Sequence, residues 1–266
     1  MASPDQAAVG PPSAWHLFDY WLTVVRRTWM GGVVSAFLSP VLYIVAMGVV
    51  LGGFIEGDPA TLDGANSYLA FVAPGLLAAH AMTLVFGETT YPVMVAVKWH
   101  KTFYGMIATP LRVRDVVNSN LVYVLARVLV VCAVFLAILL PFGVVQSWWG
   151  LLVLPVLVLI GAAFAAPVFA YSATITNESY YSLIFRLLMI PLFLFSGAFF
   201  PLSNLPAALE WIAKVTPLWH GVDLTRMLTT GHVDGGMAVV HLVYLLVLAV
   251  CGWWLAIRQL ERRLIT

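Results

Sequence analysis

The sequence predicts an all-α integral membrane protein with six transmembrane helices. Hydrophobic residues make up 62% of the chain and charged residues only 9%, whereas a soluble domain carries about 25% charged residues. The few charges gather in clusters between long apolar stretches. A chain of this composition must be solvated by lipid over most of its area.

Six stretches reach the roughly 20 apolar residues that a helix needs to cross the hydrocarbon core of a bilayer. Their predicted bounds are 32–55, 68–91, 120–141, 148–174, 182–201 and 237–257. Strands of a membrane barrel are excluded because the stretches do not alternate between polar and apolar residues. We therefore expect a single transmembrane domain over residues 1–266.

Lysine and arginine residues are divided unequally between the two sides of the predicted bundle. One side has Arg26, Arg27, Lys98, Lys101, Arg112, Arg114, Arg258, Arg262 and Arg263. The other side has Lys214 and Arg226, and its first loop carries Glu56, Asp58 and Asp63. Because cytoplasmic loops are enriched in lysine and arginine, both termini are predicted to be cytoplasmic in a multi-pass cell-membrane protein.

An amphipathic segment at residues 14–30 precedes the first span. Its polar residues His16, Asp19, Tyr20, Thr23, Arg26 and Arg27 recur at helical spacing opposite Trp15, Phe18, Leu22, Val25 and Trp29. This pattern predicts a helix that lies flat in the head-group layer. It either anchors the first span or, in addition, provides a binding surface for a cytoplasmic partner.

The longest predicted cytoplasmic segment is the loop at 93–117. It combines basic residues with an aromatic cluster of Trp99, Phe103 and Tyr104. Because Pro110 disfavours helical geometry at Thr109, a short helix should end near Ala108 and a second segment should start after it. The basic residues alone are typical of a connector, whereas the aromatic cluster favours a surface that docks another protein. Both interpretations stay open.

The segment 202–231 predicts an external helical hairpin. Asn204 is expected to cap a short helix that has Pro206 in its first turn, and Glu210 and Lys214 are spaced to pair. The apolar stripe of that helix is Leu205, Leu209, Ile212 and Val215. A break at 216–217 starts a second helix, 218–229, which ends at Gly231. Neither helix can span, so the hairpin either re-enters the membrane or covers its surface.

A few ionisable groups fall within the predicted spans. Glu88 lies near the cytoplasmic end of the second span and is either functional or an interfacial carboxylate paired with a basic group. Arg127 and Arg186 are expected to reach the cytoplasmic phosphates with their long side chains. His80 and His241 are expected to be neutral packing residues.

Several catalytic and binding patterns are absent from the sequence. It has no Walker A motif, no HExxH zinc motif and no GxSxG elbow. No histidines have metal-ligand spacing, and the carboxylates are too scattered for an acid–base pair. We therefore expect a chain that is not an enzyme and holds no metal. The alternatives are a secondary carrier and an intramembrane lipid-modifying enzyme.

Three segments carry a resemblance to a known family. They are FGETTYPVMVAVKWHKTFYGMIATPLRVRDVV at 86–117, FSGAFFPLSNLP at 195–206 and TPLWHGVDLTRMLTTG at 216–231. The chain resembles the permease subunits of ABC-2 type exporters, particularly those similar to the nodulation-factor and daunorubicin exporters. The resemblance extends in order over essentially the whole chain. It departs from the family pattern at 98–101, where KWHK replaces mixed acidic and basic residues.

The resemblance implies the membrane half of an ATP-driven exporter. Two copies of the permease would pair, each bound to a separate nucleotide-binding subunit that holds ATP and Mg²⁺. The residues that would couple to this ATPase are Glu88, Lys98, Trp99, His100, Lys101, Phe103, Tyr104, Thr109, Pro110 and Arg112. Trp99, Phe103 and Tyr104 would lie at the tip of the coupling loop and be buried by the partner.

The resemblance also implies a route for a hydrophobic or amphiphilic substrate, such as a drug, a lipid or a lipid-linked glycan. The route would run between two protomers along Met82, Phe86 and Phe195, although each of these residues is alternatively a plain packing residue. The hairpin would close the external side. Its expected gate residues are Phe199, Phe200, Trp211 and Trp219, because bulky apolar side chains exclude water from a constriction.

Overall fold

The computed structural model describes residues 64–265 continuously and, before them, residues 17, 20–24, 26, 27, 38 and 41–46. The regular elements in this part of the chain are all helices, which confirms the predicted all-α class. The predicted interfacial helix at 14–30 and the first span at 32–55 lie largely outside the described residues.

Four helices among the described residues are long and apolar enough to cross a membrane. They are Tyr68–Trp99, Val113–Phe142, Trp148–Thr174 and Gly235–Ile265. They correspond to the predicted second, third, fourth and sixth spans. The predicted fifth span is a shorter apolar helical run, Ser179–Phe195, because the chain bends from residue 196 onward. The described residues therefore contain four full-length candidate spans, and the predicted first span lies largely outside them.

The long helices are built from the following elements: α2 (Tyr68–Thr89), α3 (Tyr91–Met94) and a π-helical turn (Val95–Trp99); α5 (Val113–Leu139) and a 3-10 turn (Leu140–Phe142); a 3-10 turn (Trp148–Leu152) and α6 (Val153–Thr174); and α11 (Gly235–Ile265). The shorter run consists of α7 (Ser179–Ile184), a π-helical turn (Phe185–Met189) and α8 (Ile190–Phe195).

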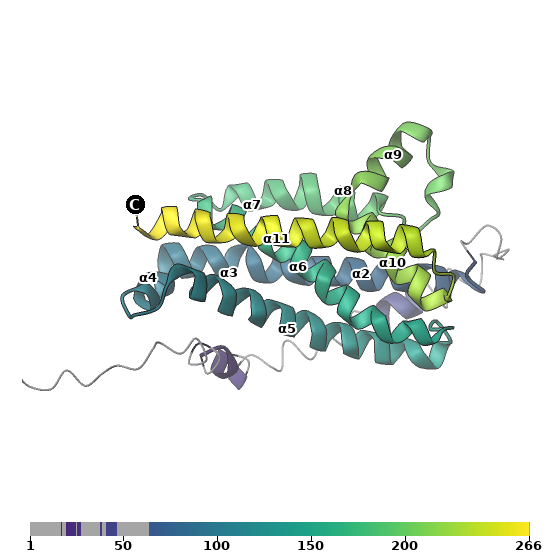
Figure 1. Cartoon of the computed structure of the whole chain (residues 1–266), viewed down its shortest axis with the longest axis horizontal. Helices are drawn as coiled ribbons and strands as arrows, with labels where there is room; N and C mark the ends of the chain where they lie inside the picture. Colours follow the sequence, from purple (N-terminus) through teal and green to yellow (C-terminus); the bar gives the residue numbers. More distant parts are fainter. Residues whose placement is uncertain are drawn as a thin grey trace, which may run out of the picture.

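The long helices run alongside one another, with α6 at the centre of the bundle (Figure 1). Helix α6 packs against α2, α5, α10 and α11. The C-terminus and α4 (Thr102–Ile107) lie at one end of the bundle, here called the loop end. Helices α9 (Ala207–Val215) and α10 (Pro217–Thr230) lie at the other, the hairpin end.

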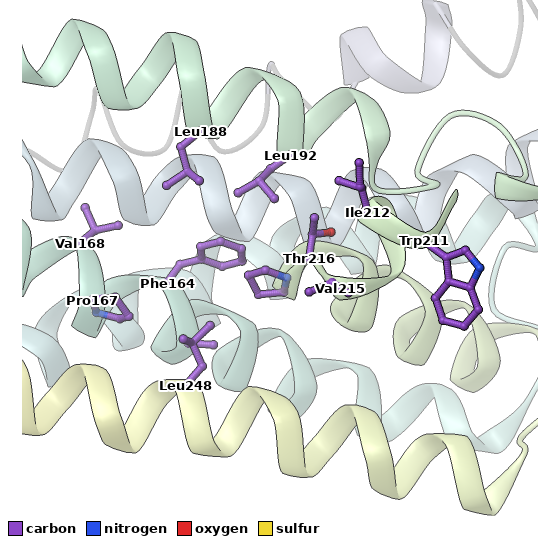
Figure 2. Close-up of a pocket in the computed structure, with 12 residues that line it drawn as sticks. Phe164, Pro167, Val168, Leu188, Leu192, Trp211, Ile212, Val215, Thr216 and Leu248 are labelled. Carbon is purple, nitrogen blue, oxygen red and sulfur yellow. The ribbon is translucent and has the colours of Figure 1, made fainter. Parts of the chain in front are cut away.

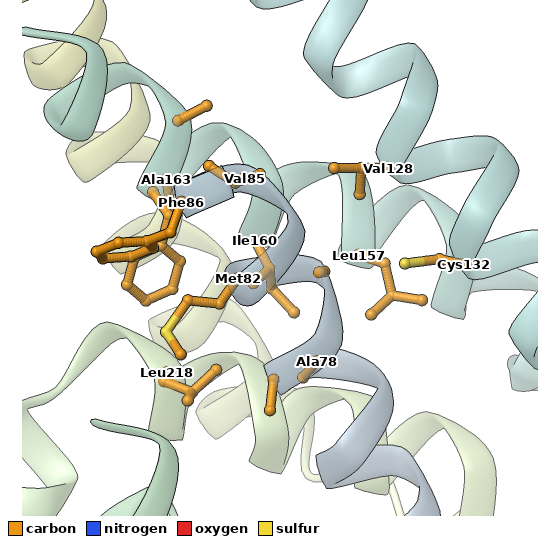
Figure 3. Close-up of a cluster of buried hydrophobic side chains, with 14 of the residues drawn as sticks. Ala78, Met82, Val85, Phe86, Val128, Cys132, Leu157, Ile160, Ala163 and Leu218 are labelled. Carbon is orange, nitrogen blue, oxygen red and sulfur yellow. The ribbon is translucent and has the colours of Figure 1, made fainter. Parts of the chain in front are cut away.

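The core lies where α2, α5, α6 and α10 meet (Figure 3). Its members in that view include Met82, Val85, Phe86, Val128, Cys132, Leu157, Ile160, Ala163 and Leu218. Helix α2 is buried nearly all round, whereas α11 buries one narrow face. The outer faces of the bundle are therefore apolar and exposed, as hydrocarbon solvent allows.

The loop end follows the predicted break around Pro110. Helix α4 ends at Ile107, and α5 starts at Val113, earlier than the predicted start of the third span at 120. The reason is a cap that a hydropathy window does not detect. The Asp115 carboxylate accepts a hydrogen bond of 3.0 Å from the backbone N–H of Arg112, so the polar first turn is helical as well.

The hairpin end contains the two predicted short helices with one corrected cap. Pro206 takes the N-cap position of α9, and Asn204 instead ends a 3-10 turn, Leu202–Asn204. The predicted pair forms, with Lys214 Nζ 2.6 Å from Glu210 Oε1. Helix α10 ends at Gly231 with φ of 85°, the left-handed conformation that favours glycine.

Candidate functional site

The loop end presents a cluster of exposed polar and aromatic side chains. Most of the residues expected to couple to an ATPase are exposed, namely Lys98, Trp99, His100, Lys101, Tyr104, Thr109, Pro110 and Arg112. Lys101 has a left-handed backbone with φ of 51°, which turns the chain sharply between the π-helical turn and α4. Trp99 is 45% exposed and leans edge-on against Tyr91, with ring centroids 5.6 Å apart.

Phe103 corrects the expectation that all three aromatic residues of the loop contact a partner. Its side chain is 1% exposed and stacks on Phe169 of α6, with ring centroids 6.2 Å apart. The ring therefore holds α4 on the bundle and is buried by this chain itself. Trp99 and Tyr104 remain available at the surface.

Two hydrogen bonds connect the loop to distant parts of the bundle. Lys98 Nζ donates to the carbonyl of Thr176 at 3.1 Å, and the Tyr104 hydroxyl donates to the carbonyl of Arg263 at 3.1 Å. The first bond reaches the connection after α6, and the second reaches the last turn of α11. A displacement of the loop would therefore be transmitted to both helices.

Glu88 and Arg127 form an ion pair between α2 and α5. Their side chains are 20% and 27% exposed, so the pair is largely shielded. This contact shows that Glu88 is a paired carboxylate, and its expected part in coupling to an ATPase stays a prediction. It also corrects the expected position of Arg127, whose guanidinium binds Glu88.

Part of the amino-terminal segment lies beside this ion pair. Residues 20–24 are helical, and Trp21 stacks on Tyr123 of α5 with ring centroids 4.4 Å apart. Trp21, Tyr123 and Glu88 line a shared cavity of about 230 Å³ together with the beginning of the loop. The loop end therefore brings the amino-terminal segment, the ion pair and the loop into one region.

A chain of three polar side chains links α10 to α11 at the hairpin end. His220 Nδ1 lies 2.7 Å from His241 Nδ1, and His241 Nε2 lies 2.9 Å from Asp223 Oδ2. Because a carboxylate only accepts, His241 Nε2 donates to Asp223 and its Nδ1 accepts from His220. Burial and, second, the neighbouring His241 lower the pKa of His220 to about 4, which keeps its ring neutral near pH 7.

Arg226 was expected to be a charge of an external loop, but the structure buries it. It is 6% exposed, and its guanidinium lies 3.9 Å from the centre of the Phe71 ring. Its Nε donates to the carbonyl of Phe71 at 3.3 Å, and Nη2 donates to the carbonyl of Gly197 at 2.6 Å. Arg226 thus joins α10 to α2 and to the bend at 196–200.

The expected gate residues occupy different surroundings. Phe199 and Phe200 are half-buried after the bend, and the Phe199 ring packs 5.0 Å from Phe193. Trp211 is 71% exposed on α9. Trp219 instead packs edge-on against the rings of the two linked histidines, with centroids 4.8 and 5.1 Å away.

The residues expected to line the substrate path are partly buried in the core and partly exposed. Met82 and Phe86 are 0% exposed within the core of the bundle, which corrects their assignment to a path surface and makes them packing residues (Figure 3). Phe195 is 42% exposed at the end of α8 and stays available to line a path.

An apolar groove of about 680 Å³ lies near the hairpin end. Figure 2 shows Leu188 and Leu192 on one side, Leu248 on the other, and Phe164 between them. Trp211 and Ile212 of α9 lie at one end of the groove. Sequence reasoning missed this groove, as it missed the histidine chain, because residues from five separate helical segments form it.

A family model for ABC-2 type transporters matches residues 13–229. The chain belongs to the ABC-2 type transporter family. Members of this family are membrane-embedded transport subunits, so the chain is a transport subunit with apolar membrane helices. Family membership also implies pairing with an ATPase subunit. The described residues contain no cluster of His, Cys, Asp or Glu that could hold a metal.

Similar proteins extend over nearly the whole chain. Nodulation protein J of Sinorhizobium fredii strain NGR234 is 29% identical and covers 98% of both chains. Nodulation protein J of Rhizobium leguminosarum bv. trifolii is 30% identical and covers 92% of this chain and 94% of its own. The counterpart in Rhizobium meliloti strain 1021 is 27% identical over 96% of both chains. This ABC-2 type chain therefore matches its relatives from end to end.

Proposed function

We propose that this ABC-2 type chain is the membrane-spanning permease of an ATP-driven exporter that moves a hydrophobic or amphiphilic molecule out of the cytoplasm or the inner leaflet. The observation that carries the proposal is the family match over residues 13–229. The sequence itself lacks a Walker A motif, so ATP and Mg²⁺ are bound by a separate subunit. The proposed cargo is a drug, a lipid or a lipid-linked glycan.

The proposed docking surface for the ATPase is the loop end. Trp99 and Tyr104 offer exposed aromatic contacts, and Lys98, Lys101 and Arg112 surround them with positive charge. Aromatic residues and arginine are enriched in protein interfaces. Because Tyr104 and Lys98 also contact α11 and the connection after α6, a movement of the ATPase would reach the spans through them.

The complete transporter is proposed to contain two copies of this chain with six spans each. The span at 32–55 and the run Ser179–Phe195 complete the count, and α9 with α10 forms a re-entrant hairpin on the external side. Both termini and the loop end face the cytoplasm, as the distribution of lysine and arginine favours. The substrate path lies between the copies and includes Phe195.

Co-purification tests the proposal. The full chain is co-expressed with a Walker A ATPase encoded beside it, extracted in mild detergent and assayed for ATP hydrolysis and transport in vesicles. We expect a stable complex with two copies of each subunit and transport that stops when the Walker A lysine is replaced. Transport by the chain alone, driven by an ion gradient, would identify a secondary carrier instead.

Cysteine labelling tests the orientation. In a background without Cys132 and Cys251, an impermeant thiol reagent should label Trp211→Cys in intact cells, whereas Lys101→Cys should react only after the membrane is opened. Both positions are exposed, so a difference in labelling reports the side of the membrane. The opposite pattern would place the ATPase surface outside and refute the docking proposal.

A further inference from the structure

The apolar groove at the hairpin end offers a ligand an almost entirely hydrocarbon surface. Among the described residues that line it, Thr216 and Trp211 alone carry polar side-chain atoms. The Thr216 hydroxyl already donates to the carbonyl of Ala213 at 2.7 Å. A water molecule needs two to four polar partners, which this lining does not supply.

Candidate membrane spans form two walls of the groove. Phe164 belongs to the candidate span Trp148–Thr174, and Leu248 belongs to the candidate span Gly235–Ile265. The opposite wall, with Leu188 and Leu192, is the apolar run Ser179–Phe195. Its volume of about 680 Å³ falls within the roughly 300–1,000 Å³ that is typical of small-molecule sites.

Helix α9 marks the level of the lipid head groups at the end of the groove. Ile212 and Val215 turn an apolar surface to the groove and are each 65% exposed. Lys214 and Glu210 form an ion pair on the same helix, and the Lys214 ammonium lies 6.0 Å from the centre of the Trp211 ring. Tryptophan and lysine together are typical of the membrane interface.

We propose that this groove binds an acyl chain of a zwitterionic phospholipid from the surrounding bilayer. The chain lies between Leu188 and Leu248, and the head group lies at α9. There the phosphate faces Lys214 and the ammonium faces Glu210, so two opposite charges on the protein match two opposite charges on the lipid. The bound lipid covers the apolar face of α9 and holds the hairpin against the bundle.

A resident lipid fits the groove better than a transported molecule does. The exposed faces of Ile212 and Val215 need a permanent cover, because α9 would otherwise keep its apolar face without a partner throughout the cycle. A substrate would leave the groove empty after each release. The proposal is independent of the cargo and requires only that the chain is embedded in a membrane.

Native mass spectrometry of the full chain tests the lipid site. The protein is reconstituted in vesicles of phosphatidylethanolamine and phosphatidylglycerol in equal parts, then extracted in mild detergent. Wild-type protein should retain phosphatidylethanolamine. Leu248→Trp, which fills the groove, should lower retention about tenfold, since each methylene group kept from burial weakens binding severalfold.

Val247→Trp is the matched control. Val247 precedes Leu248 on α11, is 55% exposed and is not part of the lining of the groove, so phosphatidylethanolamine retention should match wild type. If Leu248→Trp does not give a stable protein, Leu188→Trp fills the same groove from the opposite wall. Glu210→Gln should reverse the head-group preference toward phosphatidylglycerol, because Lys214 is then unopposed.

Four results would overturn the proposal. One is the absence of retained lipid from stable wild-type protein, and another is equal retention by Leu248→Trp and Val247→Trp. A third is a retained molecule that is the exported amphiphile rather than a phospholipid, which would assign the groove to the substrate. The fourth is cross-linking of Leu188→Cys to a second copy, which would make the groove part of the dimer interface.

Discussion

Single residues decide how charge is tolerated inside this bundle. Glu88 and Arg127 neutralise each other between α2 and α5, and the carboxylate of Asp223 orients the linked histidines of α10 and α11. Arg226 is satisfied by two backbone carbonyls and the face of Phe71. Each of these charged or polar side chains is thus held by a partner on another segment, because hydrocarbon supplies none.

The ion pair should behave as a coupled unit. Arg127→Met leaves the Glu88 carboxylate unpaired in a span, and Glu88→Gln does the same for the guanidinium, so each single variant should lower the unfolding temperature in detergent. The double variant should recover most of the loss, with a coupling free energy of about 1–3 kcal/mol. Additive losses in this cycle would show that the two side chains do not stabilise each other.

Replacing two aromatic residues of the loop should distinguish an effect on the stability of the chain from an effect on its coupling to the ATPase. Phe103→Ala removes a buried ring from its stack on Phe169 and should lower the free energy of unfolding by about 3–5 kcal/mol. Trp99→Ala removes an exposed ring, so the unfolding temperature should stay near wild type while substrate-stimulated ATP hydrolysis by the complex falls.

Thermal unfolding of the permease and ATPase assays of the complex measure these two effects. Coupled, wild-type transport by Trp99→Ala would place the ATPase contact elsewhere on the loop. Stable but uncoupled Phe103→Ala would restore the original expectation that this ring faces a partner.

At the scale of elements, close helix contacts depend on small residues. Helices α6 and α11 approach so closely at Gly252 that a Cβ there would lie 2.4 Å from Pro167 Cδ. Pro167 lies inside α6, and its rigid ring cannot move aside as a long side chain can. Small residues allow such approaches between helices in membranes, where packing and hydrogen bonds drive association.

Gly252→Ala should therefore force α6 and α11 apart. We expect a clear fall in unfolding temperature and loss of the stable dimer in mild detergent. Gly87→Ala is the matched control, because Gly87 is also helical and within a candidate span but has nothing within 4 Å of its Cβ position. That variant should be neutral or slightly stabilised, since alanine favours helix by about 1 kcal/mol over glycine. Equal behaviour of the two variants would contradict the close-contact argument.

The sequence predicted elements whose cause is local. Pro110 and Pro217 break helices, Gly231 ends α10, and the spacing of Glu210 and Lys214 produces their ion pair. The partners of Glu88 and His241 could not be predicted, because the contacting residues are far apart along the chain and spacing carries no signal for them. The burial of Phe103 depends in the same way on Phe169, a residue of another helix.

At the scale of the whole molecule, the two ends of the bundle differ in character. The loop end exposes basic and aromatic side chains, whereas the hairpin end buries Arg226, His220 and His241 and exposes Trp211, Ile212 and Val215. The division suits the proposed exporter, in which an ATPase docks at the loop end.

In the proposed dimer, the bend that carries Phe199 and Phe200 forms the external closure. Arg226 binds the carbonyl of Gly197, and a Cβ at Gly75 would lie 2.6 Å from Ala198 Cα. The bend is thereby fixed to α10 and α2. The two phenylalanine rings extend from a fixed base, and bulky apolar rings at a narrow mouth exclude water and ions.

Replacing both rings should open this closure without unfolding the bend. Phe199→Ala combined with Phe200→Ala should let small ions cross vesicles without ATP, or raise the basal ATPase activity of the complex, because the residues that fix the bend are unchanged. Phe142→Ala is the control, since Phe142 is an exposed apolar residue that ends the span leading to the hairpin end, and its vesicles should stay tight. A folded double variant that dimerises, stays ion-tight and transports normally would move the gate away from Phe199 and Phe200.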